Sequence, residues 1–85
     1  MTTFKITDEL IEKIQQLIEQ KQNKELTTLL NDLHYADIAE IIHELDIEEG
    51  VYIIRLIDAQ KTSDVLTELD DDYRENILKN LSAKE

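Results

Sequence analysis

Residues 36–81 read ADIAEIIHELDIEEGVYIIRLIDAQKTSDVLTELDDDYRENILKNL, and one apolar pattern occurs twice within them. Ala39–Ile57 aligns with Ser63–Leu81 at a constant offset of 24 residues. The apolar positions and the acidic turn residue coincide at Ile41/Val65, Ile42/Leu66, Leu45/Leu69, Asp46/Asp70, Ile53/Ile77, Ile54/Leu78 and Ile57/Leu81. A period in this range is typical of stacked-helix arrays. Only neighbouring units can cover the apolar face of each unit, so the repeat predicts an open stack of helices.

The length and composition of the chain indicate one small domain. A chain of 85 residues buries a smaller share of its surface than a large domain does, so we expect a thin stability margin. The absence of cysteine excludes disulfides and thiolate metal sites. No apolar run approaches the roughly 18–20 residues of a membrane span, and Met1–Thr7 lacks the pattern of a signal peptide. We therefore expect a soluble segment with no direct membrane insertion.

The acidic residues are concentrated in the repeat region. The chain holds 20 Asp and Glu against 9 Lys and Arg, and residues 37–85 account for 14 of these acids and 5 of the bases. Such a surface repels nucleic acid, which binds proteins through Lys and Arg, and it disfavours docking onto anionic lipid. Cations and basic protein partners remain open as ligands. A surface whose charges serve only solubility is the alternative.

The chain has no proline and one glycine, which favours helices joined by tight turns. Apolar residues recur at helical spacing in six segments: Leu10, Ile11, Ile14, Leu17 and Ile18; Leu26, Leu29, Leu30 and Leu33; Ile38, Ile41, Ile42 and Leu45; Val51, Ile53, Ile54, Leu56 and Ile57; Val65, Leu66 and Leu69; Tyr73, Ile77, Leu78 and Leu81. Met1–Ile6 and Ser82–Glu85 lack this pattern, so we expect a frayed start and a polar end.

Polar residues mark the helix boundaries. Thr7 or Asp8 can cap the first helix, and Asn23 can cap the second. The third is expected over Tyr35–Leu45. Asp46–Glu49 resembles a capping box, in which each side chain accepts from the backbone of the other residue.

The second repeat has similar boundaries. Asp58–Lys61 is expected to be a turn, and Asp70 repeats the role of Asp46. We expect Val51–Ile57 to be the most buried helix, and Gly50 to permit close helix packing. Six short helices with brief connections predict antiparallel hairpins stacked as an armadillo-like solenoid; a globular bundle is the competing architecture.

The search for catalytic chemistry finds no constellation. His43–Ile47 begins like a zinc-protease helix, but Ile47 stands where a second histidine is needed. Ser63 and Ser82 lack the glycine-rich elbow of a nucleophile. Asp70–Asp72 is explained by helix capping, although magnesium, which takes only one or two carboxylates, could share such a surface with another domain. An enzyme is therefore the least favoured of the function classes.

A family resemblance is carried by residues 33–40 (LHYADIAE), by the ELD turn at 44–46 and by residues 63–70 (SDVLTELD). These segments resemble the N-terminal cytosolic domain of MgtE-type magnesium transporters, whose motifs read LHPADIAE, ELDPEE and AAEVLxELDPE. Tyr35, Ile47 and Asp71 stand where the family has proline. Proline is favourable at the first turn of a helix but is not required there.

The resemblance implies a right-handed superhelical domain over residues 1–85, shortened at its C-terminal end. In the family, such a domain precedes CBS domains and a transmembrane pore. Magnesium bound between the cytosolic domains favours the closed channel. The acid before Val-Leu in the second repeat matches a family metal ligand, which makes Asp64 the candidate Mg²⁺ ligand. The implied partners are CBS domains of the same polypeptide within a homodimer, on the cytoplasmic side of the plasma membrane. The isolated segment is expected to bind Mg²⁺ weakly or not at all.

An interaction module is the alternative interpretation. The flagellar motor switch protein FliG carries related short helices with the pattern AAxILxxL, and it docks onto other rotor proteins without a regulatory ion. Downstream sequence would distinguish the two, since the transporter continues into membrane spans.

Overall fold

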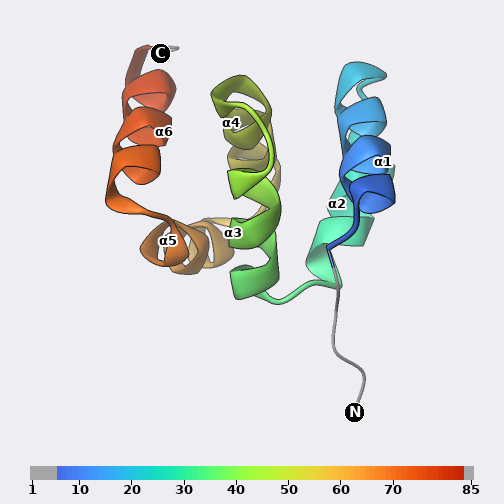
Figure 1. Ribbon diagram of the computed structural model, residues 1–85, viewed down its shortest axis with the longest axis horizontal. Helices are drawn as coiled ribbons and strands as arrows, with labels where there is room; N and C mark the ends of the chain where they lie inside the picture. The colour runs from blue at the N-terminus through green and yellow to red at the C-terminus, as the bar shows by residue number, and fades with distance from the viewer. Residues whose placement is uncertain (1–5, 84–85) are drawn as a thin grey trace.

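The computed structural model describes residues 6–83 and folds them into six α-helices, with no strand among these residues (Figure 1). The helices are α1 (Asp8–Glu19), α2 (Asn23–Asn31), α3 (Tyr35–His43), α4 (Ile47–Leu56), α5 (Ala59–Glu68) and α6 (Asp71–Ala83). The predicted all-α class and the number of helices are confirmed. No helix in the described range is long and apolar enough to cross a membrane.

Equivalent helices of the two repeats stack on each other. The most extensive contacts join α3 to α5 and α4 to α6, so each helix packs on the one that lies 24 residues away. This is the arrangement expected of a stacked-hairpin array. The first hairpin joins differently, because α1 packs along α2 and against α4. As a result α4 stands between α6 and α1 (Figure 1). The right-handed sense of the superhelix stays a prediction.

Side-chain caps fix most of the helix starts. The Thr7 hydroxyl accepts from the backbone N–H of Leu10 at 3.1 Å. The predicted capping box of α4 is confirmed: the Glu49 N–H donates to Asp46 Oδ1 at 2.9 Å, and the Asp46 N–H donates to Glu49 Oε1 at 3.2 Å. Each such cap satisfies backbone donors that have no partner within the helix.

Three predicted boundaries were wrong. Asp58–Lys61 is the first turn of α5 and its cap, because the Lys61 N–H donates to Asp58 Oδ1 at 2.8 Å. Gln22, without a side-chain bond, is the N-cap of α2, while Asn23 Oδ1 instead accepts from the Tyr52 hydroxyl. The third helix ends at His43, two residues early, because the N–H groups of Glu44 and Leu45 tighten its last turn by bonding three residues back.

The predictions for the chain ends hold only in part. Residues 1–5 and 84–85 lie outside the described residues. Ile6 packs against the core, and α6 continues through Ser82 to Ala83, where a polar stub was expected.

The core is aliphatic and continuous through all three hairpins. Nine of its side chains are almost fully buried: Ile14, Leu26, Leu30, Ile38, Ile41, Ile42, Ile53, Val65 and Ile77. The fourth helix was expected to be the most buried, but α3 buries as many residues because it lies between α4 and α5. Gly50 on α4 permits close packing, as predicted: a Cβ there would lie 3.1 Å from Ile42 Cγ2 and 3.1 Å from Ile77 Cδ1.

The second repeat is less buried than the first. Ile54 is 4 % exposed, whereas its equivalent, Leu78, is 45 % exposed. At two other equivalent positions, buried Gly50 and Val51 of the first repeat correspond to charged Arg74 and Glu75 of the second. The first repeat is covered by the second, and no further helix of the described residues covers the second. Position in the stack therefore decides burial, even where the apolar pattern repeats.

This difference predicts unequal costs for two equivalent substitutions. Ile54→Ala should lower the free energy of unfolding by about 2–4 kcal/mol, because it leaves a cavity in the core. Leu78→Ala should lower it by less than about 1 kcal/mol, because Leu78 contacts solvent. Urea denaturation followed by circular dichroism measures both. Equal losses would show that Leu78 is covered in solution, contrary to this arrangement.

Candidate functional site

Asp64, the predicted magnesium ligand, lies on the outer side of α5. Its neighbour Val65 is fully buried, which turns the Asp64 carboxylate to solvent. The described residues contain no group of three or more His, Cys, Asp or Glu side chains that could hold a metal ion. The fold therefore does not bring Asp64 together with further ligands, and its metal-binding role stays a prediction.

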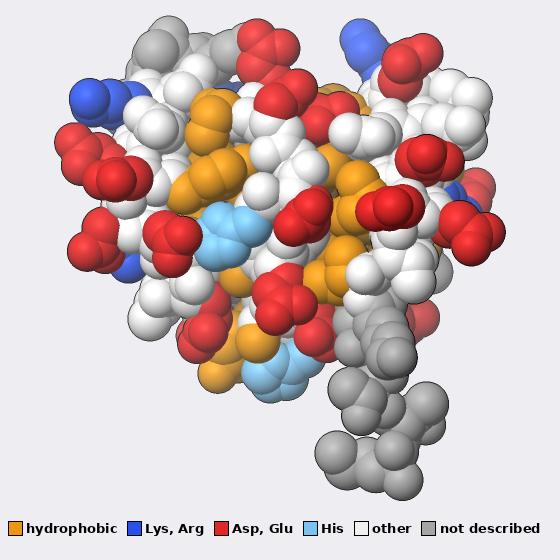
Figure 2. Space-filling model, viewed as in Figure 1, with side chains coloured by type: hydrophobic (Ala, Val, Ile, Leu, Met, Phe, Trp, Pro, Cys, Tyr) orange, Lys and Arg blue, Asp and Glu red, His pale blue; other side chains and the backbone are white. Residues whose placement is uncertain are grey.

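Acidic side chains are spread over the face that carries α1 together with the second and third hairpins. Figure 2 shows Asp and Glu spread over this face, with small apolar patches between them and Lys and Arg at its margins. Among the described side chains, Lys and Arg form close ion pairs with only two carboxylates, those of Asp71 and Glu75. Most of the acidic charge is thus not neutralised within this part of the chain, and its field extends toward an approaching partner.

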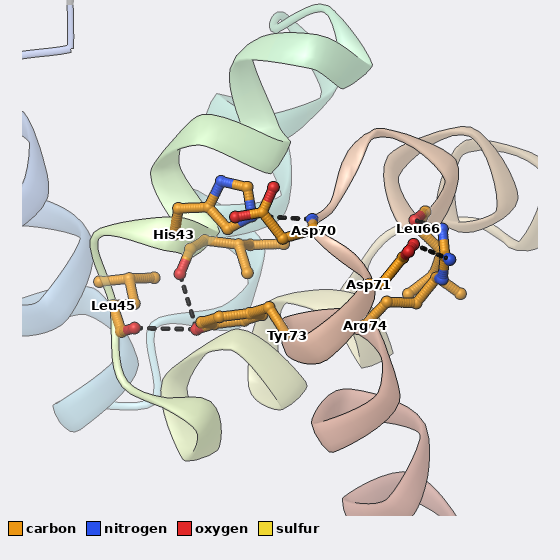
Figure 3. A network of polar contacts seen from close by, with 8 residues as sticks. His43, Leu45, Leu66, Asp70, Asp71, Tyr73 and Arg74 are labelled. Carbon is orange, nitrogen blue, oxygen red and sulfur yellow. Dashed lines mark hydrogen bonds and ion pairs between the residues drawn. The ribbon is translucent and has the colours of Figure 1, made fainter.

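A polar network joins the end of α3 to the start of α6 (Figure 3). The backbone N–H of Asp70 donates to His43 Nε2 at 3.3 Å, and Asp70 Oδ2 lies 4.0 Å from the same nitrogen. Because Nε2 accepts, the proton of the neutral imidazole is on Nδ1. The His43 ring meets the Tyr73 ring edge-on, with centroids 5.3 Å apart. His43 is half-buried at this corner.

The Tyr73 hydroxyl is the centre of the network. It lies 2.7 Å from the carbonyl oxygen of Ile42 and 2.8 Å from that of Leu45, in the tightened turn at the end of α3 (Figure 3). Burial, followed by the carboxylates of Asp46 and Glu49, raises the pKa of Tyr73 from 10.0 to about 12. The phenol therefore stays protonated and donates at neutral pH, and its function is structural.

Two other polar side chains hold the corners of the stack. His34 caps α3, since its Nδ1 accepts from the Ala36 N–H at 3.2 Å. Arg74 Nη2 donates to Asp71 at 2.6 Å, while its Nη1 lies 3.4 Å from the carbonyl oxygen of Leu66 near the end of α5. Sequence reasoning missed the Tyr73 and Arg74 contacts. The available signal was a tyrosine in an otherwise aliphatic stripe directly after a cluster of acids.

The comparisons with known proteins agree with this architecture. A family model described as the MgtE intracellular N domain matches residues 33–85. The match begins just before α3 and covers both repeats and Asp64. Searches of curated proteins and of solved structures returned no match.

The Tyr73 network predicts a stability loss at high pH. Tyr73→Phe should lower the free energy of unfolding by about 1–2 kcal/mol at pH 7, because the carbonyl oxygen of Leu45 loses the phenol as its donor. Since the folded-state pKa is about 12 against 10.0 for the ordinary group, this contribution is complete below pH 10 and is lost as pH rises toward 12. Urea denaturation at pH 7, 10 and 11.5 measures it.

Tyr35→Phe is the matched control, because the Tyr35 hydroxyl makes none of the hydrogen bonds found between described residues. The Tyr35→Phe chain should have nearly the wild-type free energy of unfolding at pH 7. This free energy should fall with alkaline pH as it does in the wild type. The Tyr73→Phe chain should decline less steeply above pH 10. Parallel profiles for Tyr73→Phe and the wild type would contradict the proposed network.

Proposed function

Because the chain belongs to the family of MgtE intracellular N domains, we propose that it is the magnesium-sensing regulatory region of a magnesium transporter. The family match over residues 33–85 carries this proposal and favours it over a flagellar module. The matched region holds both repeats and most of the acidic charge of the chain. A non-enzymatic role at the cytoplasmic side of the membrane, within a homodimer, is part of the proposal.

The proposed mechanism is electrostatic. The carboxylates of residues 37–85 repel a second acidic surface, which keeps the two domains apart. We propose that the second surface belongs to CBS domains of the same polypeptide. Magnesium, when bound, supplies positive charge between the two surfaces. Domain docking would then be linked to a closed pore.

Asp64 fits one half of such a site. Magnesium retains several waters and commonly takes one or two carboxylates, so a single exposed carboxylate can contribute to a shared site. Asp64 projects from a helix whose other face is anchored by buried Val65 and Leu69, which fixes its position. The remaining ligands would come from the partner surface.

This proposal predicts weak magnesium binding by the 85-residue chain alone. Isothermal titration calorimetry with MgCl₂ should show no saturable binding at micromolar concentrations, because the chain supplies only part of the site. Tight stoichiometric binding would contradict a shared site.

The complete cytosolic region should respond more strongly. Small-angle scattering should show a smaller radius of gyration as magnesium is added, and Asp64→Asn should shift the midpoint to higher magnesium. Glu25→Gln removes the same charge on α2, outside the family match, and should leave the midpoint unchanged. An unchanged radius, or equal shifts for the two variants, would overturn the proposal.

A further inference from the structure

A groove of about 720 Å³ runs along α4, between α1 and α6. Its apolar lining consists of Ile18 from α1 and of Val51 and Tyr52 from α4, and Asn80 of α6 lines its other side. The groove lies where α4 stands between α1 and α6 (Figure 1). A cleft of this size lies within the range of well-formed binding pockets.

Hydrogen bonds hold the lining of the groove in place. The Tyr52 hydroxyl bonds to Asn23 Oδ1, and Gln15 Nε2 donates to Glu49 Oε1 at 3.3 Å. These two contacts also fix how the first hairpin lies relative to α4. The middle of α1 lies beside the first turn of α4, and the start of α2 lies beside the middle of α4. A groove whose side chains are already positioned loses little entropy when it binds a ligand.

The charges along the groove are separated. Asp46, Glu48 and Glu49 line it at the first turn of α4, whereas Arg55 lines it at the last turn of α4. Along α4 the lining therefore carries three negative charges at one end and one positive charge at the other, while Glu19 and Lys21 of the first hairpin add one charge of each sign. Along α4, Glu48 and Arg55 are about 10 Å apart, or two helical turns.

An ordinary α-helix has the complementary pattern. Helices favour acids in the first turn and bases in the last, because these charges offset the helix dipole. An apolar stripe at three- and four-residue spacing matches the apolar lining of the groove. Its basic last turn would meet Asp46, Glu48 and Glu49, which requires that it lie antiparallel to α4.

We propose that this groove binds one amphipathic helix of a partner protein, antiparallel to α4, with its basic C-terminal turn at Glu48 and Glu49. This site differs from the proposed magnesium site in two ways. It lies on α4, whereas Asp64 lies on α5, and its ligands are the basic side chains of a partner helix. The interaction does not require magnesium, so it stands or fails apart from the proposed sensing function.

A peptide with defined polarity tests the proposal. The probe is a fluorescein-labelled synthetic helix of about 15 residues with leucines three and four residues apart, glutamates in the first turn and arginines in the last. The matched probe has the same leucines with the two charged ends exchanged. Binding to the 85-residue chain is measured by fluorescence anisotropy in EDTA and at low salt. We expect saturable binding of the first probe, with the second at least five-fold weaker.

Charge reversal on the chain locates the site. Glu48→Arg should weaken binding of the first probe about five-fold, and a probe with glutamate in place of its terminal arginines should restore it. Glu68→Arg makes the same change on α5, outside the groove, and should leave affinity unchanged. Both positions are exposed, so circular dichroism should confirm that both variants fold.

Three results would overturn the proposal. These are the absence of saturable binding by the first probe, equal affinity for the two probes, and equal weakening by Glu48→Arg and Glu68→Arg. The last result would show that the probe responds only to the overall acidic charge of the chain.

Discussion

The close approach of α6 to α4 at Gly50 is the constraint on which the rest of the stack depends. Any other side chain at this position would place its Cβ 3.1 Å from both Ile42 and Ile77 and 3.3 Å from the Tyr73 hydroxyl. Three helices, α3, α4 and α6, therefore meet around a residue without a side chain. The separation of the repeats is set there, because interiors pack densely and cannot absorb an added group without displacement.

The polar corner follows from this apolar contact. Once Ile77 lies against Gly50, Tyr73 one turn earlier on α6 reaches the carbonyls at the end of α3. Asp70 then lies at the ring of His43. The network thus locks a position that hydrophobic packing has already selected. The network restricts the position of α6 further, since a hydroxyl between carbonyl oxygens tolerates little displacement.

The features that could be predicted from the sequence are those set by local chemistry. The Asp46–Glu49 box, the caps at Thr7 and His34, and close packing at Gly50 all follow from a residue type and its immediate neighbours. Contacts between distant segments were missed. Asn23 was expected to cap α2, but its Oδ1 accepts from the hydroxyl of Tyr52, which lies 29 residues later. Local propensity cannot predict a hydrogen bond to so distant a residue.

The repeat pattern likewise could not predict the placement of the first hairpin. The 24-residue offset covers only the second and third hairpins, so it contains no information on how α1 meets α4. The exposed position of Asp64 could be inferred from its place beside Val65, whereas its missing co-ligands could not. A repeat fixes the contacts between its own copies and leaves the contacts with its flanks to be found in the structure.

The acidic residues at the start of α4 exceed what a helix terminus requires. One oxygen that accepts from a backbone N–H is sufficient for capping, and serine or threonine supplies it as well as aspartate does. Asp46 and Glu49 satisfy the backbone reciprocally, and Glu48 adds a third, exposed carboxylate. Because the capping box immobilises two of these carboxylates, their charge is presented in a fixed direction. The charge of these two carboxylates is therefore available for recognition at little further cost in side-chain entropy.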